Sequence, residues 1–248
     1  GTYTSGTAWI LDTGVSTTTG DLNVDTTNAA YFIGDSFEDD NRHGTHKAGI
    51  IAAIDNDVGV VGVAPGAPVV PVKVCDSEGT CPAGCVLRGF NHIATYAEVG
   101  DVVNISLTAD FVGDGRLEEL LRRAISMAIL RSDGANYVTG SGNNGECLDK
   151  MREELLPASM NKLHLTTVTA YNEDGTFRSR SNYGSAIDFA APGQNIESLD
   201  IDGGMYTTDG TSSATAFVSG IFLVQGFVSS DGTVTDPDGV DISKAHLE

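Results

Sequence analysis

Short apolar runs and longer stretches with helical spacing alternate along this chain. A strand that is buried on both faces reads as a continuous apolar run, whereas a helix that covers a sheet repeats its apolar positions every three or four residues. The apolar runs predict strands at residues 8–11, 69–74, 102–106, 137–139 and 165–170, and the helical spacing predicts helices at residues 43–54, 85–99, 117–130 and 211–227.

This order of elements predicts an α/β fold. Strands that alternate with helices usually form a parallel sheet, because each crossover helix returns the chain to the same end of the sheet. We therefore expect three layers, with a mostly parallel central sheet and helices on both faces. The 248 residues carry no internal repeat or linker, so we expect one domain over residues 1–248, with an acidic, turn-rich tail from about residue 229 and a cloning remnant at 247–248.

Composition and charge narrow the range of partners. The chain has 14 Lys and Arg against 34 Asp and Glu, a formal net charge of -20. Such a surface repels phosphates, so we expect neither nucleic acid nor membrane as a partner. No run of about 18 apolar residues could span a bilayer, and no basic segment followed by an apolar one opens the chain. We expect acidic pairs such as Asp39-Asp40 on a solvated surface, with divalent-cation binding or a saline habitat as the alternatives.

The chain has four cysteines, Cys75, Cys81, Cys85 and Cys147, which permit three pairings into two disulfides. Their spacing lacks the paired C-x-x-C and the downstream His ligands of a zinc site. We expect at least one disulfide and an oxidising compartment, with a cluster of buried free thiols as the alternative.

Three segments place a reactive side chain at the end of an expected element. Asp12 ends the first apolar run in A-W-I-L-D-T-G, His43 opens a helix in N-R-H-G-T-H-K-A-G, and Ser212 opens another in D-G-T-S-S-A-T-A. Taken singly, each residue has a plainer interpretation: an Asp in a turn, a structural His, and a Ser that caps a helix. The G-x-S-x-G turn of α/β-hydrolases is absent, because Ala214 stands where the second Gly would be.

The three segments together, in this order, resemble the subtilisin-like serine protease family, the subtilases. The resemblance covers roughly residues 7–225 and rests on D-T-G, H-G-T-H-x-A-G and G-T-S-x-A. It implies that Ser212 is the nucleophile, that His43 is the general base and then the general acid, and that Asp12 orients His43. His46 is then structural. The chain is thereby identified as one subtilisin-like catalytic domain.

The same resemblance implies an oxyanion donor and a substrate strand. Asn143, in Y-V-T-G-S-G-N-N-G, matches the asparagine that donates to the oxyanion, with Asn144 as the adjacent competitor. Ser106, Leu107 and Thr108 match the strand that pairs with an extended peptide. Thr108 stands where the family has Gly, so we expect a narrower pocket entrance. Leu155 is expected near the base of that pocket, which would favour a small or medium substrate residue there.

A structural calcium ion (Ca²⁺) is also implied by the resemblance. Its ligands would be the Asp21 carboxylate, the Asn56 side chain and the backbone carbonyls of Ile54, Val58 and Val60. Calcium takes about 6–8 hard oxygen ligands, which such a set helps to supply. The alternative is a turn rich in Asp and Asn that ends the helix starting at His43.

The expected protein is a secreted or extracellular monomer that hydrolyses peptide bonds through an acyl-enzyme. Its partners would be an extended peptide or protein substrate and a propeptide or protein inhibitor. Two positions depart from the family pattern: Ala216 stands where the family generally has Pro, and Phe217 where it commonly has His. Because Ala216 restores a backbone N–H, we keep a transacylase or peptide ligase as one alternative. An inactive subtilase-like binding domain is the other, although all three triad positions and Asn143 are intact.

Overall fold

A parallel sheet forms the middle of the computed structural model, which describes residues 6–107, 115–132, 134–151 and 155–248. Within these residues the strand order is β11-β12-β8-β7-β6-β5-β1-β4-β2, and β3 pairs with β4 beside this path. The parallel strands are β1 (Ala8–Asp12), β2 (Asn23–Val24), β3 (Ala30–Tyr31), β4 (Pro68–Lys73), β5 (Val102–Ile105), β6 (Asn136–Gly140), β7 (Leu165–Tyr171) and β8 (Phe189–Pro192).

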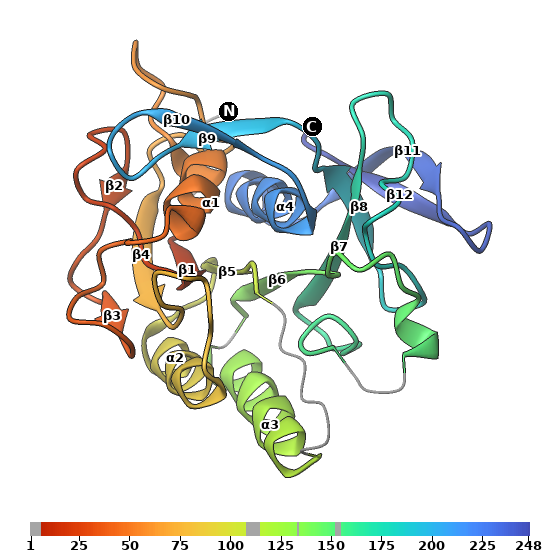
Figure 1. Cartoon of the computed structure of the whole chain (residues 1–248), viewed down its shortest axis with the longest axis horizontal. Coiled ribbons are helices and arrows are strands. Elements are labelled where there is room, and N and C mark those ends of the chain that lie inside the picture. Colours follow the sequence, from red (N-terminus) through yellow and green to blue (C-terminus); the bar gives the residue numbers. More distant parts are fainter. Residues whose placement is uncertain (1–5, 108–114, 133, 152–154) are drawn as a thin grey trace.

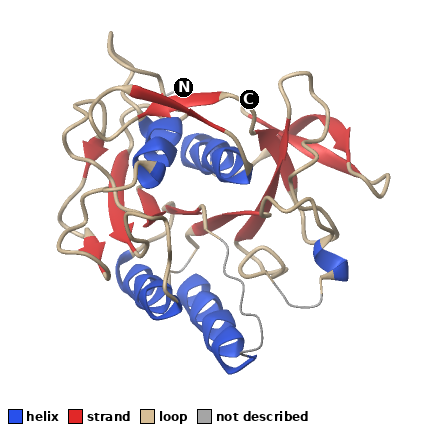
Figure 2. Cartoon of the chain, viewed as in Figure 1, coloured by secondary structure: helices blue, strands red, loops and turns tan. Residues whose placement is uncertain are grey.

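Helices cover both faces of this sheet (Figure 1, Figure 2). Helices α1 (His43–Ala52) and α4 (Thr211–Gln225) lie on one face, and α2 (Ala83–Tyr96) and α3 (Gly115–Arg131) lie on the other. The three-layer α/β fold predicted from the sequence is therefore confirmed.

Strand β1 shows why the central strands read as continuous apolar runs. Its alternate residues point to opposite faces of the sheet. Ala8 and Ile10 pack in the core beneath α1 and α4, whereas Trp9 and Leu11 pack in the core formed with α2 and α3. All five residues of β1 are buried, so burial on both faces leaves no alternation in the sequence.

The remaining elements lie around this sheet. A short antiparallel pair, β9 (Ile196–Leu199) with β10 (Met205–Thr208), contacts α1 on its outer side. A short 3₁₀ turn, η1 (Leu148–Lys150), follows β6. No helix among the described residues is both long and apolar enough to cross a bilayer.

The helices and long strands lie where the pattern predicts them, with ends shifted by a few residues. The tail is different: instead of a turn-rich segment, β11 (Ser229–Thr235) and β12 (Asp241–His246) form a hairpin that extends the sheet beside β8. The hairpin buries only Val234 and Ile242 against Ala190. Two buried side chains are too few to produce an apolar run, which is why the pattern missed these strands.

The structure contains one disulfide, between Cys75 and Cys81. Cys85 and Cys147 are buried and free. The expectation of at least one disulfide is confirmed, and the two remaining cysteines are buried free thiols.

Candidate active site

Asp12 is the last residue of β1, a central strand of the sheet. Ligand sites of open α/β sheets lie at these carboxyl ends of the strands. Its side chain is 2% exposed. Oδ1 accepts the backbone N–H of Thr13 at 2.7 Å, and Oδ2 is buried without a hydrogen-bond partner among the described residues. The Asp12 carbonyl accepts the N–H groups of Val74 and Cys75, which anchors the end of β1 to the segment after β4.

His43 opens helix α1, and the carboxylate of Asp39 fixes the start of that helix. Oδ1 of Asp39 accepts the N–H groups of Asn41 and Arg42, and Oδ2 accepts the N–H and hydroxyl of Thr45. Asp39 is only 7% exposed, so it is no solvated surface acid as the sequence suggested. Its carboxylate satisfies helix N–H groups that have no intrahelical partner.

The approach of α1 to the end of β1 requires glycine in the H-G-T-H segment. A Cβ atom on Gly44 would lie 2.1 Å from the carbonyl oxygen of Gly14. Gly44 N–H donates to the hydroxyl of Thr13 at 2.9 Å. Only a residue without a side chain lets these two segments meet, and their contact brings His43 beside Asp12.

The imidazole of His43 is held by Asp12. Nδ1 of His43 lies 2.7 Å from Oδ1 of Asp12, and the His43 side chain is 33% exposed. A carboxylate accepts hydrogen bonds only, so Nδ1 carries the proton and Nε2 presents a lone pair. This is the tautomer that a general base needs in order to accept a proton through Nε2.

Ser212 lies in the first turn of α4, half-buried between the buried Thr211 and Ser213. Its hydroxyl donates to the carbonyl of Ser106 at 3.3 Å, and its own carbonyl accepts the Ser106 hydroxyl at 3.3 Å. Among the described residues it makes no hydrogen bond to His43. Ser106 and His43 line the same cavity, however, so Ser212 contacts the rim of the cleft that holds the Asp12–His43 pair.

Asn143 follows β6 and lies beside the start of α4. Its Oδ1 accepts the backbone N–H of Thr211 at 2.9 Å. Because a backbone N–H can only donate, this contact assigns the oxygen side of the amide and leaves Nδ2 as the outward donor. Gly210 makes room for it: a Cβ there would lie 3.0 Å from Oδ1, at a φ of 127° that favours glycine. The neighbouring Asn144 is exposed and is held instead through its backbone N–H by Asn182.

A cavity of about 360 Å³ lies beside the Asp12–His43 pair. Ser106 and Leu107, which follow β5, line one side of it, and Thr108 lies outside the described residues. Leu155, expected near the base of the pocket, does not line this cavity: it is 6% exposed, and a Cβ on Gly142 would approach its Cδ2 to 2.8 Å. Leu155 is thus buried beneath the loop that carries Asn143.

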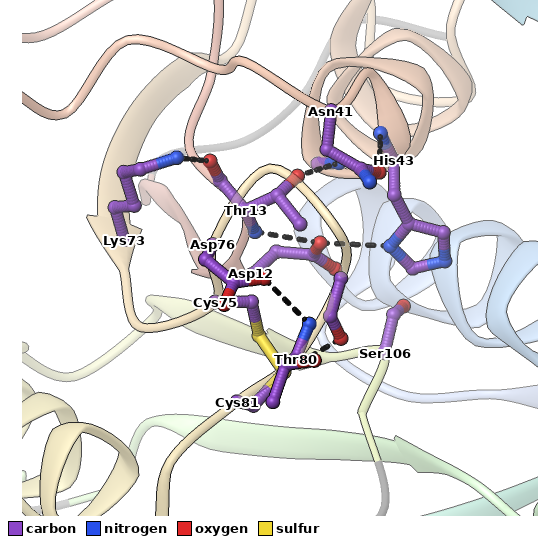
Figure 3. Close-up of a disulfide and its surroundings, with 12 residues drawn as sticks. Asp12, Thr13, Asn41, His43, Lys73, Cys75, Asp76, Thr80, Cys81 and Ser106 are labelled. Atoms are coloured by element: carbon purple, nitrogen blue, oxygen red, sulfur yellow. Dashed lines mark hydrogen bonds and ion pairs between the residues drawn. A yellow bond between two sulfur atoms is a disulfide. The ribbon is translucent and has the colours of Figure 1, made fainter. Parts of the chain in front are cut away.

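The disulfide loop forms the other wall of this cavity (Figure 3). Residues 75–81 are closed by the Cys75–Cys81 bond, and Asp76 Oδ1 accepts the N–H groups of Glu78 and Thr80 inside the loop. Cys75, Glu78, Gly79 and Cys81 all line the cavity. The cysteine count predicted a disulfide, but only the fold places it against the site.

The residues predicted to bind calcium come together in part. The buried Asp21 accepts Asn56 Nδ2 at 2.8 Å, and its carbonyl accepts the N–H of Ile54 at 3.1 Å. Val58 N–H donates to Asn56 Oδ1, and a Cβ on Gly59 would lie 2.6 Å from Asp21 Oδ2, so the loop that continues to Val60 passes over this carboxylate. Asp21 Oδ2 is buried, and no described residue hydrogen-bonds it. Among the described residues no group of three or more His, Cys, Asp or Glu side chains could hold a metal.

Two buried lysines flank the Asp12–His43 pair, and sequence reasoning missed both. Lys73, at the end of β4, donates to the Thr13 carbonyl and to Asp40. Lys47, one turn along α1 from His43, is 1% exposed, and its bonds among the described residues go to neutral groups. The available signal was a charged residue directly before the apolar A-G-I-I of a helix predicted to cover the sheet.

His46 is structural in its contacts, in keeping with the prediction. Its Nε2 lies 2.9 Å from the carbonyl of Tyr206 and 3.1 Å from that of Ile196, so Nε2 carries a proton. Burial, followed by the charge of Lys47, lowers the pKa of His46 to about 3. The ring is therefore neutral, and its Nδ1 accepts a hydrogen bond from Lys47.

Comparison with known proteins agrees with this geometry. The subtilase family matches residues 9–226. The minor extracellular protease Epr of Bacillus subtilis (strain 168) is 33% identical over 215 residues, which are 87% of this chain and 31% of that protein. An intracellular serine protease of Paenibacillus polymyxa is 34% identical over 218 residues, 85% of this chain and 63% of that protein. The chain spans less than two thirds of either relative.

A solved structure extends the likeness to three dimensions. The crystal structure of a cold adapted subtilisin-like serine proteinase superposes with a TM-score of 0.77 at 26% identity, covering 98% of this chain and 88% of that one. The described elements thus have the arrangement of a subtilisin-like proteinase.

Proposed function

This chain belongs to the subtilase family, and on that premise we propose that it is a serine endopeptidase that cleaves peptide bonds through Ser212, His43 and Asp12. The observation that carries the proposal is the 2.7 Å contact between His43 Nδ1 and Asp12 Oδ1, at a cavity whose rim contacts Ser212. A serine hydroxyl is a poor nucleophile near neutral pH, and this contact orients the base that activates it.

The proposed reaction has two steps. Ser212 Oγ turns from the Ser106 carbonyl toward His43, whose Nε2 takes the hydroxyl proton as Oγ attacks the substrate carbonyl. Catalytic contacts of this kind often tighten only when substrate is bound. The protonated His43 then gives its proton to the leaving amine, and water, activated by the same Nε2, hydrolyses the acyl-enzyme. Asp12 stabilises the imidazolium while it exists.

Asn143 is the proposed oxyanion donor. Its amide oxygen is held by Thr211, so Nδ2 is oriented before the substrate arrives and needs no rearrangement as negative charge develops. Asn144 lacks this orientation, since its described contact is a backbone one. Loss of one such donor typically costs about 10²–10³-fold in kcat.

The proposed substrate is an extended peptide that adds as a strand beside Ser106 and Leu107. Backbone bonds would give affinity, and the cavity bounded by the disulfide loop would accept a substrate side chain. Thr108 belongs to this proposal from its sequence position alone. The prediction of one catalytic domain over residues 1–248 stays a prediction, as does a propeptide or protein inhibitor.

The test is fluorophosphonate labelling of wild type and Ser212→Ala, followed by digestion of a peptide library. We expect a label on wild type alone, and cleavage that disappears with Ser212→Ala. Absence of labelling on a folded wild type would favour the inactive binding domain instead. Labelling with ligation but without cleavage would favour the transacylase; Ala216→Pro should then restore hydrolysis.

We also propose a structural calcium ion at Asp21. The fit rests on Asp21 Oδ2, a buried carboxylate oxygen that no residue in the described part of the chain hydrogen-bonds, beneath a loop whose carbonyls are hard oxygen ligands. Asp21, the Asn56 side chain and the carbonyls of Ile54, Val58 and Val60 would hold the ion, which would neutralise the buried carboxylate. A chelator should lower the melting temperature of wild type. The free energy of unfolding should fall by about 2.7 kcal/mol if calcium was present at a hundredfold its Kd. Asp21→Asn should be insensitive; an equal response of both proteins would overturn the site.

An extracellular location is proposed on the disulfide, because such bonds persist in oxidising compartments. Growth of the source cells with separate assay of medium and cell lysate by an antibody to this chain tests it. Enrichment in the lysate would contradict the proposal.

A further inference from the structure

Lys47 is a buried cation without an anionic partner. Its side chain is 1% exposed, and among the described residues no carboxylate bonds it. Burying an unpaired charge is costly, so a lysine in this position calls for a physical explanation.

The surroundings of Lys47 are built for three N–H donors. Nζ lies 2.9 Å from Ser213 Oγ, 3.1 Å from Thr208 Oγ1 and 3.2 Å from His46 Nδ1. The Nδ1 atom is an acceptor, because the Nε2 proton faces two carbonyl oxygens. An ammonium carries three donors, and here each has one acceptor. The protonated form of Lys47 thus completes this cluster.

These contacts tie together the segments that carry the base and the nucleophile. Lys47 lies on α1, one turn from His43, whereas Thr208 ends β10 and Ser213 follows Ser212 in α4. Thr208 and Ser213 also contact each other, Oγ1 to Oγ, at 3.1 Å. The Lys47 ammonium therefore binds both ends of the turn that carries Ser212, and it connects this turn to α1, the helix that carries His43.

Lys47 can exchange its proton with solvent through a cavity of about 590 Å³ that it lines together with His43. The titratable and charged groups that face this region are Asp12 from β1, Arg42, His43 and His46 at the start of α1, and Tyr206 and Asp209 near β10. The carboxylates of Asp200 and Asp209 are paired with Arg42 and Arg178, so neither carboxylate supplies a counter-ion to Lys47.

We propose that Lys47 is a positioning residue of the Ser212 site: its ammonium form holds the 208–213 turn against α1, and loss of that proton loosens Ser212 relative to His43. The inference rests on the proposed function, because it concerns the alignment of the same base and nucleophile. A neutral amine has one donor fewer, so the cluster must rearrange when Lys47 loses its proton.

Lys47 loses its proton near neutral pH. Burial lowers the pKa of Lys47 to about 7, and the charge of Asp12 opposes part of that fall. Activity should therefore fall as the pH rises through this range and Lys47 loses its proton.

The test is the pH profile of kcat and KM on a chromogenic peptide for wild type, Lys47→Met, Ser213→Ala and the control Lys162→Met. Lys162 is exposed and lies beside α3, on the other side of the sheet. Lys47→Met should lose the alkaline fall and lower kcat at its optimum by about ten- to a hundredfold, with KM changed less, since a small misplacement is costly. Ser213→Ala removes one acceptor of the ammonium, so its alkaline fall should move to lower pH.

Several outcomes would overturn the proposal. They are an unchanged alkaline fall in Lys47→Met, a Ser213→Ala profile that matches wild type, or an effect of Lys162→Met equal to that of Lys47→Met. If Lys47→Met does not fold, the direction of the Ser213→Ala shift decides.

A second readout keeps this inference separate from the proposed function. The backbone amide NMR signals of Thr208 and Ser213 should titrate near neutral pH in wild type but not in Lys47→Met. If the fluorophosphonate leaves wild type unlabelled, the proposed function fails and these signals still decide the coupling. If wild type is labelled and the amides do not titrate, the coupling alone fails.

Discussion

The surroundings of the two buried lysines, Lys73 and Lys47, differ in one respect. The Lys73 side chain is 2% exposed and is paired with Asp40, whose carboxylate side chain is 53% exposed. The Lys47 side chain is equally buried but faces two hydroxyls and an imidazole nitrogen. Lys73 bonds the carbonyl of Thr13, next to Asp12, whereas Lys47 bonds the residue after Ser212.

The two lysines show two ways in which a buried ammonium is accommodated beside the candidate site. Asp40 remains largely hydrated, so its pairing with Lys73 compensates the buried cation without burying a second ion. Among the described residues Lys47 bonds neutral groups, which satisfy its donors, while the charge of Asp12 offsets only part of the cost of its burial. We therefore expect Lys73 to stabilise the fold through its ion pair, and Lys47 to lose its proton near neutral pH.

The largest effect should come from Asp12→Asn, which removes the anion that orients His43 and raises the pKa of Lys47. A neutral amide no longer selects the His43 tautomer with its lone pair on Nε2, so kcat should fall by about 10⁴-fold. The pKa of Lys47 should fall further, because the Asp12 charge is what raises it. Steady-state kinetics and NMR titration of the lysine side chain measure the two effects; a drop in kcat below tenfold would contradict the assignment of Asp12.

Lys73→Met should destabilise the protein by about 1–3 kcal/mol, because it leaves the buried carbonyl of Thr13 without its donor. Asp40 rehydrates, which keeps the loss below that of a fully buried broken pair. Urea unfolding measures the change. A variant as stable as wild type would place Lys73 in the same class as Lys47 and remove the comparison.

Cys75→Ala combined with Cys81→Ala should cost about 2 kcal/mol, the chain-entropy value for so short a loop. The disulfide starts two residues after Lys73 and closes the cavity wall, so KM for peptides should rise more than kcat falls. The Cys85→Ala variant, which keeps the disulfide, is the control. An unchanged KM in the double variant would show that the loop takes no part in substrate binding.

Lys47→Met should have the opposite sign from Lys73→Met, a stabilisation on the order of 1 kcal/mol at pH 6. Folding lowers the pKa of Lys47 from 10.5 to about 7, so the unfolded chain binds the extra proton between these values. Wild type is therefore most stable above pH 10.5 and loses this stability as the pH falls to about 7. The Lys47→Met variant has no such loss. Its stability advantage over wild type should therefore be full below pH 7 and shrink toward pH 10 in thermal melts. An advantage that grows with pH would sink the explanation.

The candidate site illustrates how far the sequence carries. Asp12, His43 and Ser212 could be picked out because each stands at the end of a predicted element within a specific motif. Asp39 could not, because an acidic pair in a loop reads the same whether it is solvated or caps a helix. The hairpin of β11 and β12 was missed for a related reason: a strand that buries few side chains leaves little apolar pattern.

By itself, the sequence determined the helices, the long central strands, the mostly parallel sheet and the choice of the residues proposed to react, because these depend on local periodicity and short motifs. Only the tertiary structure decided that Cys75 and Cys81 wall a cavity beside His43, that Asp40 neutralises Lys73, and that Lys47 contacts the residue after Ser212. A side chain is buried and bonded by residues that are far apart from it in the chain. The cost of burying a charged side chain therefore depends on these partners rather than on its neighbours in sequence.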